Sequence, residues 1–283
     1  MNATGARFLV VVRAGDASLH PQWTSDPATR DWDLVVSYYG DDLYRFHDGA
    51  APRIDDKGQK LGGLHSLLTR EDFWRRYDYI WLPDDDVAIA QQGVSELFRQ
   101  TAALDLALTQ PALSWDSYWS HRVTLHHPSF RLRMTNYVEV MAPCFERSFL
   151  ENCLSTFIES MSGWGLDILW PRRLPARPRR CAVIDDVQMT HTRPVGAGQH
   201  YDRLRDAGVS AQQEFDTVLR RHGIPADSKA LVYAGIDRGG RRLDAARADE
   251  LVLLRQLLET DRAAFAACAV QQPQPASERH FRG

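Results

Sequence analysis

An apolar run that ends in three consecutive carboxylates constrains this chain more than any other feature. Residues 77–87 read YDYIWLPDDDV, and Tyr79 to Leu82 have the aromatic and β-branched bias of a buried strand. Asp84, Asp85 and Asp86 follow after one proline. Three like charges at a strand end repel one another, and a divalent cation held by carboxylate oxygens would offset that cost. A solvated acidic turn is the alternative explanation at this point.

Strand-like and helix-like segments alternate along the first half of the chain. Apolar runs at 8–12, 33–39 and 104–111 predict further buried strands. Apolar side chains that recur every three or four residues predict helices over 62–77 and 94–104. This alternation predicts an α/β fold with a mostly parallel central sheet flanked by helices. Open sheets of this kind bind ligands at the carboxyl ends of their strands.

The middle of the chain predicts one more strand and one more helix. Residues 137–142, YVEVMA, alternate like a strand that lies across the sheet. Ser148 and Glu151 have the spacing of a capping box, which predicts a helix that begins there. The apolar face of this helix is expected to extend to Ile158 and Met161.

No linker rich in Pro, Gly or Ser separates a second domain. We expect a catalytic domain over 1–199 and a helical C-terminal extension over 200–269 that packs on the same domain. The helices of that extension are predicted near 212–221 and 246–265. The Pro- and Gln-rich residues 270–283 are expected to be disordered.

Composition excludes several classes of protein. A net charge of -3 over 283 residues gives no global attraction to nucleic acid. The four cysteines form no CxxC pair, which argues against a zinc site or a disulfide framework. No run approaches the roughly 20 apolar residues of a membrane span, so we expect a cytoplasmic protein without a transmembrane segment. The oligomeric state stays open.

The phrase GWGLD at 163–167 is a second candidate site. Its two glycines permit a tight turn, or a close approach of substrate to the backbone at Gly165. Trp164 offers a flat apolar face to a sugar ring, as does Trp115 in an aromatic stretch, and Asp167 is a candidate general base for an acceptor hydroxyl. A helix-ending turn with a core tryptophan and an Asp N-cap is the alternative.

Three more side chains could complete a site for a metal-bound diphosphate. His191 follows a short strand, where a neutral imidazole would be a further metal ligand, although a lone histidine there is often structural. Arg193 could bind a phosphate in bidentate fashion. Lys60 lies in a glycine-rich segment before a helix, which is typical of phosphate-binding corners. Asp185 and Asp186 are weaker candidates for orienting His191 or for anchoring the loop. The chain lacks the Walker-A and GxGxxG spacings, which argues against P-loop and classical dinucleotide-binding proteins.

The ordered series of motifs resembles a bacterial and plant family known as domain of unknown function seven hundred and seven. The matching phrases are RFLVVVRAGDASLHPQW, KGQKLGGL, YDYIWLPDDDV, LTQPAL, YVEVMAPCFER, GWGLD and VIDDVQMTHTRPVG, within residues 7–197. The resemblance implies a GT-A-like glycosyltransferase fold. On that template Asp84 and Asp86 match the DxD motif, His191 the late metal ligand and Asp167 the acceptor-side base.

We therefore expect a metal-dependent glycosyltransferase that moves a sugar from a nucleotide-diphosphate donor to a glycan or small-molecule acceptor. The expected metal is Mn²⁺ or Mg²⁺, bound by Asp84, Asp86 and His191. Asp86 is expected to bind it directly, whereas Asp84 is expected to reach it through water or to hydrogen-bond a donor ribose. The expected donor-binding side chains are Asp84, Asp85, Lys60 and Arg193. Two alternatives stay open, namely a metal-dependent nucleotidyl- or phosphoryl-transfer enzyme and a non-catalytic nucleotide- or carbohydrate-binding protein on the same fold.

Overall fold

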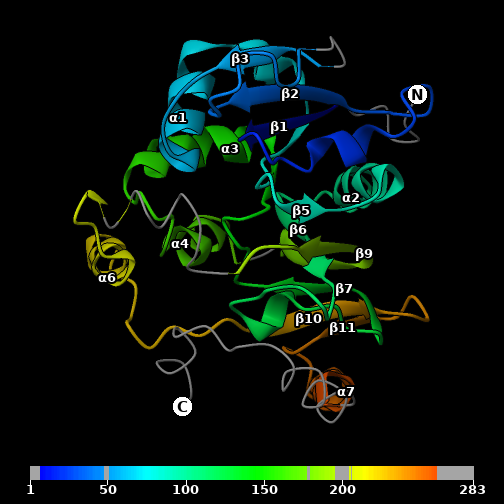
Figure 1. Cartoon of the computed structure of the whole chain (residues 1–283). Helices are drawn as coiled ribbons and strands as arrows, with labels where there is room; N and C mark the ends of the chain where they lie inside the picture. The colour runs from blue at the N-terminus through cyan, green and yellow to red at the C-terminus, as the bar shows by residue number, and fades with distance from the viewer. Residues whose placement is uncertain (1–6, 48–50, 177–178, 195–203, 205, 260–283) are drawn as a thin grey trace.

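The computed structural model describes residues 7–47, 51–176, 179–194, 204 and 206–259. Within these residues the chain forms a mixed β-sheet with helices on both faces (Figure 1). The strands are β1 (Phe8–Ala14), β2 (Asp33–Tyr38), β3 (Arg53–Asp55), β4 (Tyr79–Trp81), β5 (Val87–Ala88), β6 (Leu108–Leu113), β7 (Phe130–Thr135), β8 (Cys144–Glu146), β9 (Cys181–His191), β10 (Val232–Asp237) and β11 (Arg242–Asp244). The helices are α1 (Lys60–Arg70), α2 (Gln91–Ala103), α3 (Arg147–Leu154), α4 (Leu166–Arg172), α6 (Ala211–Arg221) and α7 (Ala248–Glu259).

The strands follow the order β11-β10-β7-β9-β6-β8-β4-β1-β2-β3, and β5 pairs with β9 off this path. Neighbours β4, β1, β2 and β3 are all parallel. Strand β6 is antiparallel to β8, which is antiparallel to β4, so β6 and its parallel partner β9 run in the direction of β4. Strand β10 also runs this way, because it is antiparallel to β7 and β7 to β9. The prediction of a mostly parallel central sheet flanked by helices is confirmed.

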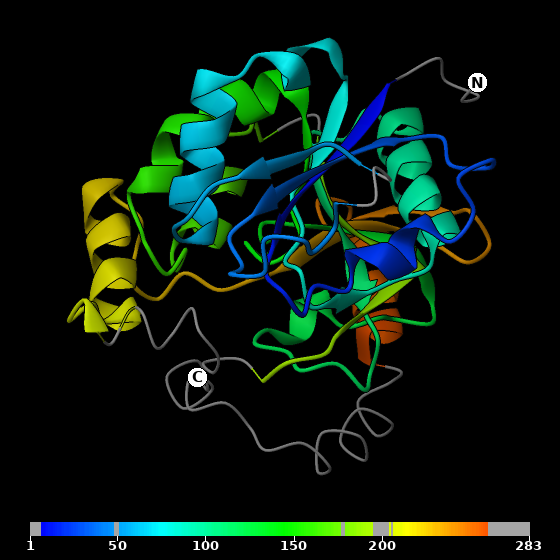
Figure 2. The same ribbon diagram turned by 45° about the horizontal axis from the view of Figure 1, so that its top comes forward.

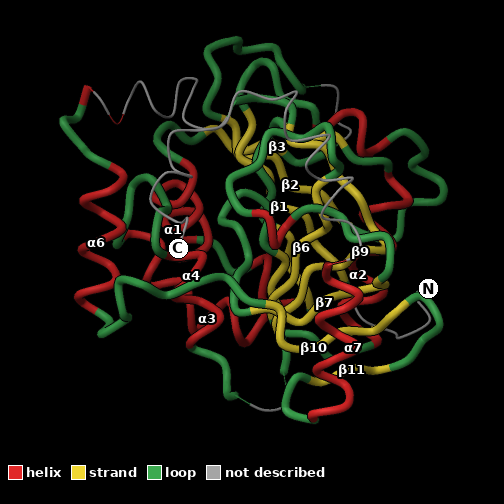
Figure 3. The backbone as a smooth tube through the Cα atoms, turned by 90° about the horizontal axis from the view of Figure 1, so that it is seen from below, coloured by secondary structure: helices red, strands yellow, loops and turns green. Residues whose placement is uncertain are grey.

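The two faces of the sheet carry separate cores because side chains alternate along each strand. Leu9 and Val11 of β1 are buried in a core that also contains apolar side chains of α1, α3, α4 and α6. Val10 and Val12 point to the other face, into a core that contains those of α2. Figure 2 shows α1 and α2 on opposite sides of β1 and β2, and Figure 3 shows the strands between the two groups of helices.

Two predictions for the middle of the chain are wrong. Residues 137–142 form no strand; they belong to a loop after β7, and their alternation arises because Tyr137 and Val138 are buried in the core from irregular backbone. The helix α3 begins at Arg147, with Glu146 rather than Ser148 as its N-cap. Beyond α3 and a 3-10 turn, the expected apolar face ends, because Ile158 and Met161 are exposed.

The C-terminal region adds more than helices. The helices predicted near 212–221 and 246–265 correspond to α6 and α7. Between them β10 and β11 extend the sheet next to β7, which the sequence pattern did not indicate. Residues 270–283 lie outside the described residues. In the described part of the chain, no helix has the length and apolar character that crossing a membrane requires.

Candidate active site

A cavity of about 530 Å³ lies at the carboxyl ends of several strands of the sheet. Its walls contain Tyr39, which follows β2, and the acidic triplet, which follows β4. His191, the last residue of β9, also lines it. We call this space the central cavity. Its opposite wall is apolar and includes Val140, Met161 and Trp164.

The middle carboxylate of the triplet, Asp85, is used to hold the surrounding loops together. Its Oδ2 accepts hydrogen bonds from the Gly15 N–H at 2.7 Å and the Tyr39 hydroxyl at 3.2 Å. Its Oδ1 accepts one from the Arg193 guanidinium at 3.0 Å. Burial raises the pKa of Asp85, while the Gly15 N–H and the Arg193 charge oppose that rise. Asp85 therefore links the segments after β1, β2 and β9.

The first carboxylate, Asp84, forms an ion pair with Lys60. The Lys60 ammonium lies 2.7 Å from Oδ1 of Asp84 and also donates to the carbonyls of Val140 and Met141 at 2.7 and 2.8 Å. An ammonium has three N–H groups, and these three partners can use all of them. Lys60 thus holds Asp84 and the loop after β7 in place, and its contact with a phosphate stays a prediction.

The third carboxylate, Asp86, lies beside His191 in the lining of the central cavity. Nε2 of His191 lies 3.4 Å from Oδ2 of Asp86, and Nδ1 lies 2.9 Å from the carbonyl of Tyr118. The Nδ1–H donates to this carbonyl and fixes the ring with Nε2 toward Asp86, which is the usual support of a metal-binding histidine. Burial would lower the pKa of His191, but the hydrogen bond and charge of Asp86 raise it to about 9.

A divalent cation fits this end of the cavity through Asp86 and His191. Oδ1 of Asp86 is buried and has no hydrogen-bond partner among the described residues, which a bound cation would account for. Across the described ranges, however, no three His, Cys, Asp or Glu side chains are already gathered as a metal cluster. Asp84 would therefore have to turn away from Lys60 to become a third ligand.

The turn around Trp164 connects the central cavity to α6. Gly163 and Gly165 have backbone φ values of 81° and 92°, which residues other than glycine rarely adopt. A Cβ atom at Gly165 would lie 3.0 Å from Val218 of α6, so this glycine allows close packing of two helices. Trp164 lines the cavity. The glycine spacing is thus explained by packing, and acceptor contact at Trp164 and Gly165 stays a prediction.

Asp167 lies in the first turn of α4 and lines the same cavity. Its Oδ2 accepts a hydrogen bond from the Tyr137 hydroxyl at 2.8 Å, and Nδ1 of His121 lies 2.7 Å from that hydroxyl. Because the phenol donates its only proton to Asp167, it accepts from the Nδ1–H of His121. Burial raises the pKa of Asp167 to about 6 and lowers that of His121 to about 4. Asp167 is therefore an ionised, well-oriented carboxylate near neutral pH.

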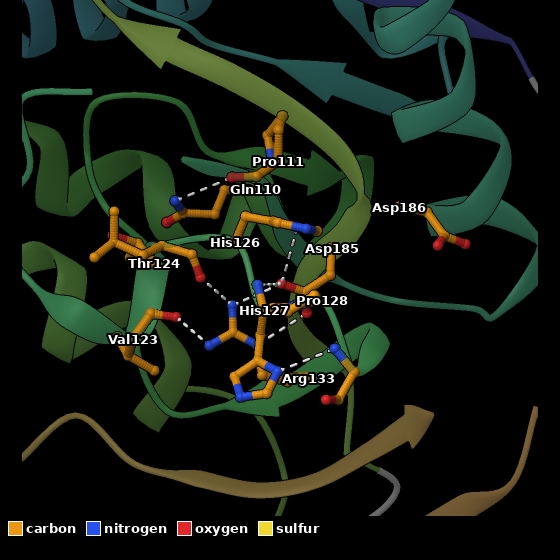
Figure 4. A network of polar contacts seen from close by, with 12 residues as sticks. Gln110, Pro111, Val123, Thr124, His126, His127, Pro128, Arg133, Asp185 and Asp186 are labelled. Carbon is orange, nitrogen blue, oxygen red and sulfur yellow. Dashed lines mark hydrogen bonds and ion pairs between the residues drawn. The ribbon is translucent and has the colours of Figure 1, made fainter. Parts of the chain in front are cut away.

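The remaining predicted residues lie away from the central cavity. The Trp115 indole donates to the carbonyl of His126 at 2.8 Å, and this tryptophan is not among the cavity-lining residues of the described chain. Asp185 forms a buried pair with Arg133, with N–O distances of 2.9 and 2.8 Å (Figure 4). Asp186 binds Arg131 at 2.9 Å. These two carboxylates connect β9 to β7 rather than orient His191.

Several polar residues of the central cavity were not identified from the sequence as candidates, among them Tyr137, Glu139 and His121. Tyr137 and Glu139 come from the segment that the pattern assigned to a strand, and His121 from the aromatic stretch before β7. The available signal was the presence of two polar positions in the otherwise apolar phrase YVEVMA.

Comparisons with known proteins give no family. No family model matches the chain, and no curated protein matches it. Similar solved structures include TarS 1-349 of S. aureus in complex with UDP-GlcNAc, at 13% identity and a TM-score of 0.47, which covers 76% of this chain and 65% of that one. A second TarS 1-349 structure has 10% identity, a TM-score of 0.49 and coverage of 76% and 64%.

GalNAc-T7 with UDP, GalNAc and Mn²⁺ has 8% identity, a TM-score of 0.45 and coverage of 76% and 50%. The present chain therefore spans less than two thirds of the length of each of these proteins. At these TM-scores the similarities carry no argument about function, which has to be argued from the site.

Proposed function

We propose that the chain is a metal-dependent glycosyltransferase with a GT-A-like fold, which moves a sugar from a nucleoside diphosphate to a hydroxyl group of an acceptor. One observation carries the proposal. The central cavity has a candidate cation site, Asp86 with His191, and a buried carboxylate held by a hydrogen bond, Asp167, on the same lining. The resemblance to family seven hundred and seven agrees with it and itself stays a prediction.

The residues at the cation end suit a donor diphosphate. Asp86, His191 and, after release from Lys60, Asp84 would hold Mn²⁺ or Mg²⁺, which would neutralise the diphosphate as it leaves. Arg193 is 41% exposed in its side chain, and its two terminal nitrogens donate to Asp85 and to the carbonyl of Ala17. A phosphate would use its remaining N–H groups.

The residues at the other end suit proton removal from an acceptor. The acceptor oxygen forms a bond to the anomeric carbon, and the bond from that carbon to the diphosphate oxygen breaks with its electron pair on the diphosphate. The acceptor proton passes to Asp167. A carboxylate whose pKa is about 6 is ionised at neutral pH and basic enough for this step. Tyr137 keeps it oriented.

The experiment that tests the donor end measures thermal unfolding of the wild-type chain with UDP, GDP, UDP-glucose and GDP-mannose, each with and without Mn²⁺. We expect at least one nucleotide to raise the melting temperature only when Mn²⁺ is present. Asp86→Ala should abolish this dependence on Mn²⁺, whereas Asp116→Ala, which removes an exposed carboxylate, should keep it. An Asp86→Ala variant with the full Mn²⁺-dependent shift would exclude the metal assignment.

The catalytic end is tested with Asp167→Asn. This variant should bind the donor like the wild type and lose transfer. Free sugar and nucleoside diphosphate as products of slow donor hydrolysis would support glycosyl transfer, whereas release of phosphate or pyrophosphate would support phosphoryl or nucleotidyl transfer instead. If Asp167→Asn left every measured property unchanged, the chain would be a binding protein without turnover.

A further inference from the structure

Glu139 is a buried carboxyl group of the central cavity to which the proposed mechanism gives no role. It lies in the loop after β7, lines the cavity and is only 7% exposed. Its Oε2 is fully buried and has no hydrogen-bond partner within the described residues. The side chains of Gln110 and Thr124 hydrogen-bond to the same carboxyl group, which leaves Oε2 as the oxygen without a donor.

The backbone around Glu139 is held on both sides. Its N–H donates to the side-chain oxygen of Gln110 in β6 at 2.6 Å. The carbonyls of the next two residues, Val140 and Met141, accept hydrogen bonds from Lys60. Glu139 therefore lies on a loop that is fixed to the sheet and to α1.

Glu139 interacts electrostatically with both the cation end and the acceptor end of the site. Burial is the main cause that raises its pKa to about 7, the His191 charge acts in the opposite direction, and the Asp167 charge adds to the rise. One carboxyl group thus interacts with the cation end and with the acceptor end. In the proposed reaction, the group that lies between these two ends is the sugar in transfer.

We propose that Oε2 of Glu139 accepts a hydrogen bond from a hydroxyl group of the transferred sugar, which makes Glu139 a binding residue for the sugar part of the donor. The inference rests on the proposed function. A sugar offers several hydroxyl donors, and Glu139, whose pKa is about 7, can accept through Oε2 in its ionised form. The sugar therefore supplies the donor that the protein itself does not provide to this oxygen.

The test compares ligands with and without the sugar. Affinities of UDP against UDP-glucose, and of GDP against GDP-mannose, are measured by calorimetry with Mn²⁺ for wild type, Glu139→Gln and Glu139→Ala. We expect Glu139→Ala to weaken the nucleotide sugar at least tenfold and to leave the parent diphosphate within twofold. Glu139→Gln should give a smaller loss, because its amide oxygen still accepts. Glu71→Gln, near the protein surface, should change neither affinity.

Two outcomes would overturn the inference: an equal loss for both ligands, or no loss for either. A wild-type chain that binds no nucleotide would instead refute the proposed function, so the two failures are distinguishable. A second measurement uses only the wild-type protein, so it does not depend on whether the variants fold. Deoxy analogues of the donor sugar are bound to the wild type, and removal of one particular hydroxyl should cost about tenfold. If no hydroxyl matters, Glu139 does not bind the sugar.

Discussion

Glu139→Gln should change how stability depends on pH. The folded-state pKa of Glu139 is about 7, against an ordinary value of 4.5. Because the native state holds the proton more tightly than the unfolded state, the free energy of unfolding falls as pH rises between these two values. Glutamine cannot titrate. The variant is therefore spared this loss, and its advantage over the wild type should grow with pH.

The magnitude follows from the difference between the two pKa values. Their difference of about 2.5 units corresponds to about 3 kcal/mol, at 1.36 kcal/mol for each unit. Most of this change falls between pH 5 and pH 8. The Glu139 carboxyl is fully buried, so solvent screening requires no reduction of the figure. Titrating groups that do not interact with Glu139 are present in both proteins and cancel in the comparison, whereas Asp167 and His191 interact with it.

The assay is urea unfolding of both proteins at pH 5 and pH 8, in buffer with a chelator. The stability of Glu139→Gln minus that of the wild type should be about 2–3 kcal/mol larger at pH 8 than at pH 5. Since the Asp167 charge contributes to the raised pKa of Glu139, the same comparison in an Asp167→Asn background should give a smaller difference. A difference that does not vary with pH would refute the claim that burial raises this pKa.

Three other predictions concern neighbouring features. Tyr137→Phe removes a hydrogen bond that lowers the pKa of Asp167, so this pKa should rise above about 6. The acidic limb of the pH–rate profile for transfer should then move to higher pH by about one unit. A limb at the same pH in both proteins would contradict this role of the Tyr137 hydroxyl. Asp185→Ala leaves the buried Arg133 without its partner and should cost about 3–5 kcal/mol in urea unfolding, so a loss below 1 kcal/mol would count against it. Gly165→Ala combines a positive φ with a close contact and should cost about 1–3 kcal/mol, measured in the same way.

The sequence identified the local part of this architecture well. Buried strands of the parallel region are continuous apolar runs, and the segments at 8–12 and 33–39 are of that kind, so β1 and β2 were predictable without tertiary information. The acidic triplet lies where predicted, at the carboxyl end of β4. The turn at 163–167 was also recognisable from its two glycines.

The parts that were missed depend on long-range contacts. The phrase YVEVMA alternates, but Tyr137 is buried against helices and Glu139 is tied to β6, so a loop copies the pattern of a strand. The segment that forms β10 is only partly buried and sits at one side of the sheet, where a strand has a weak apolar signal. Tertiary packing overrides the local pattern in both cases.

The three carboxylates of the triplet have different partners, so their positions decide their roles more than their number does. Asp85, in the turn after β4, points toward the loops after β1 and β2, while Asp84 forms an ion pair with Lys60 and Asp86 lies beside His191. The three hydrogen bonds to Asp85 use its carboxylate for structure. A sequence cannot assign these roles, because Arg193 approaches Asp85 from 108 positions away. The middle carboxylate thus fixes the backbone that carries the other two, which the proposed function assigns to the cation.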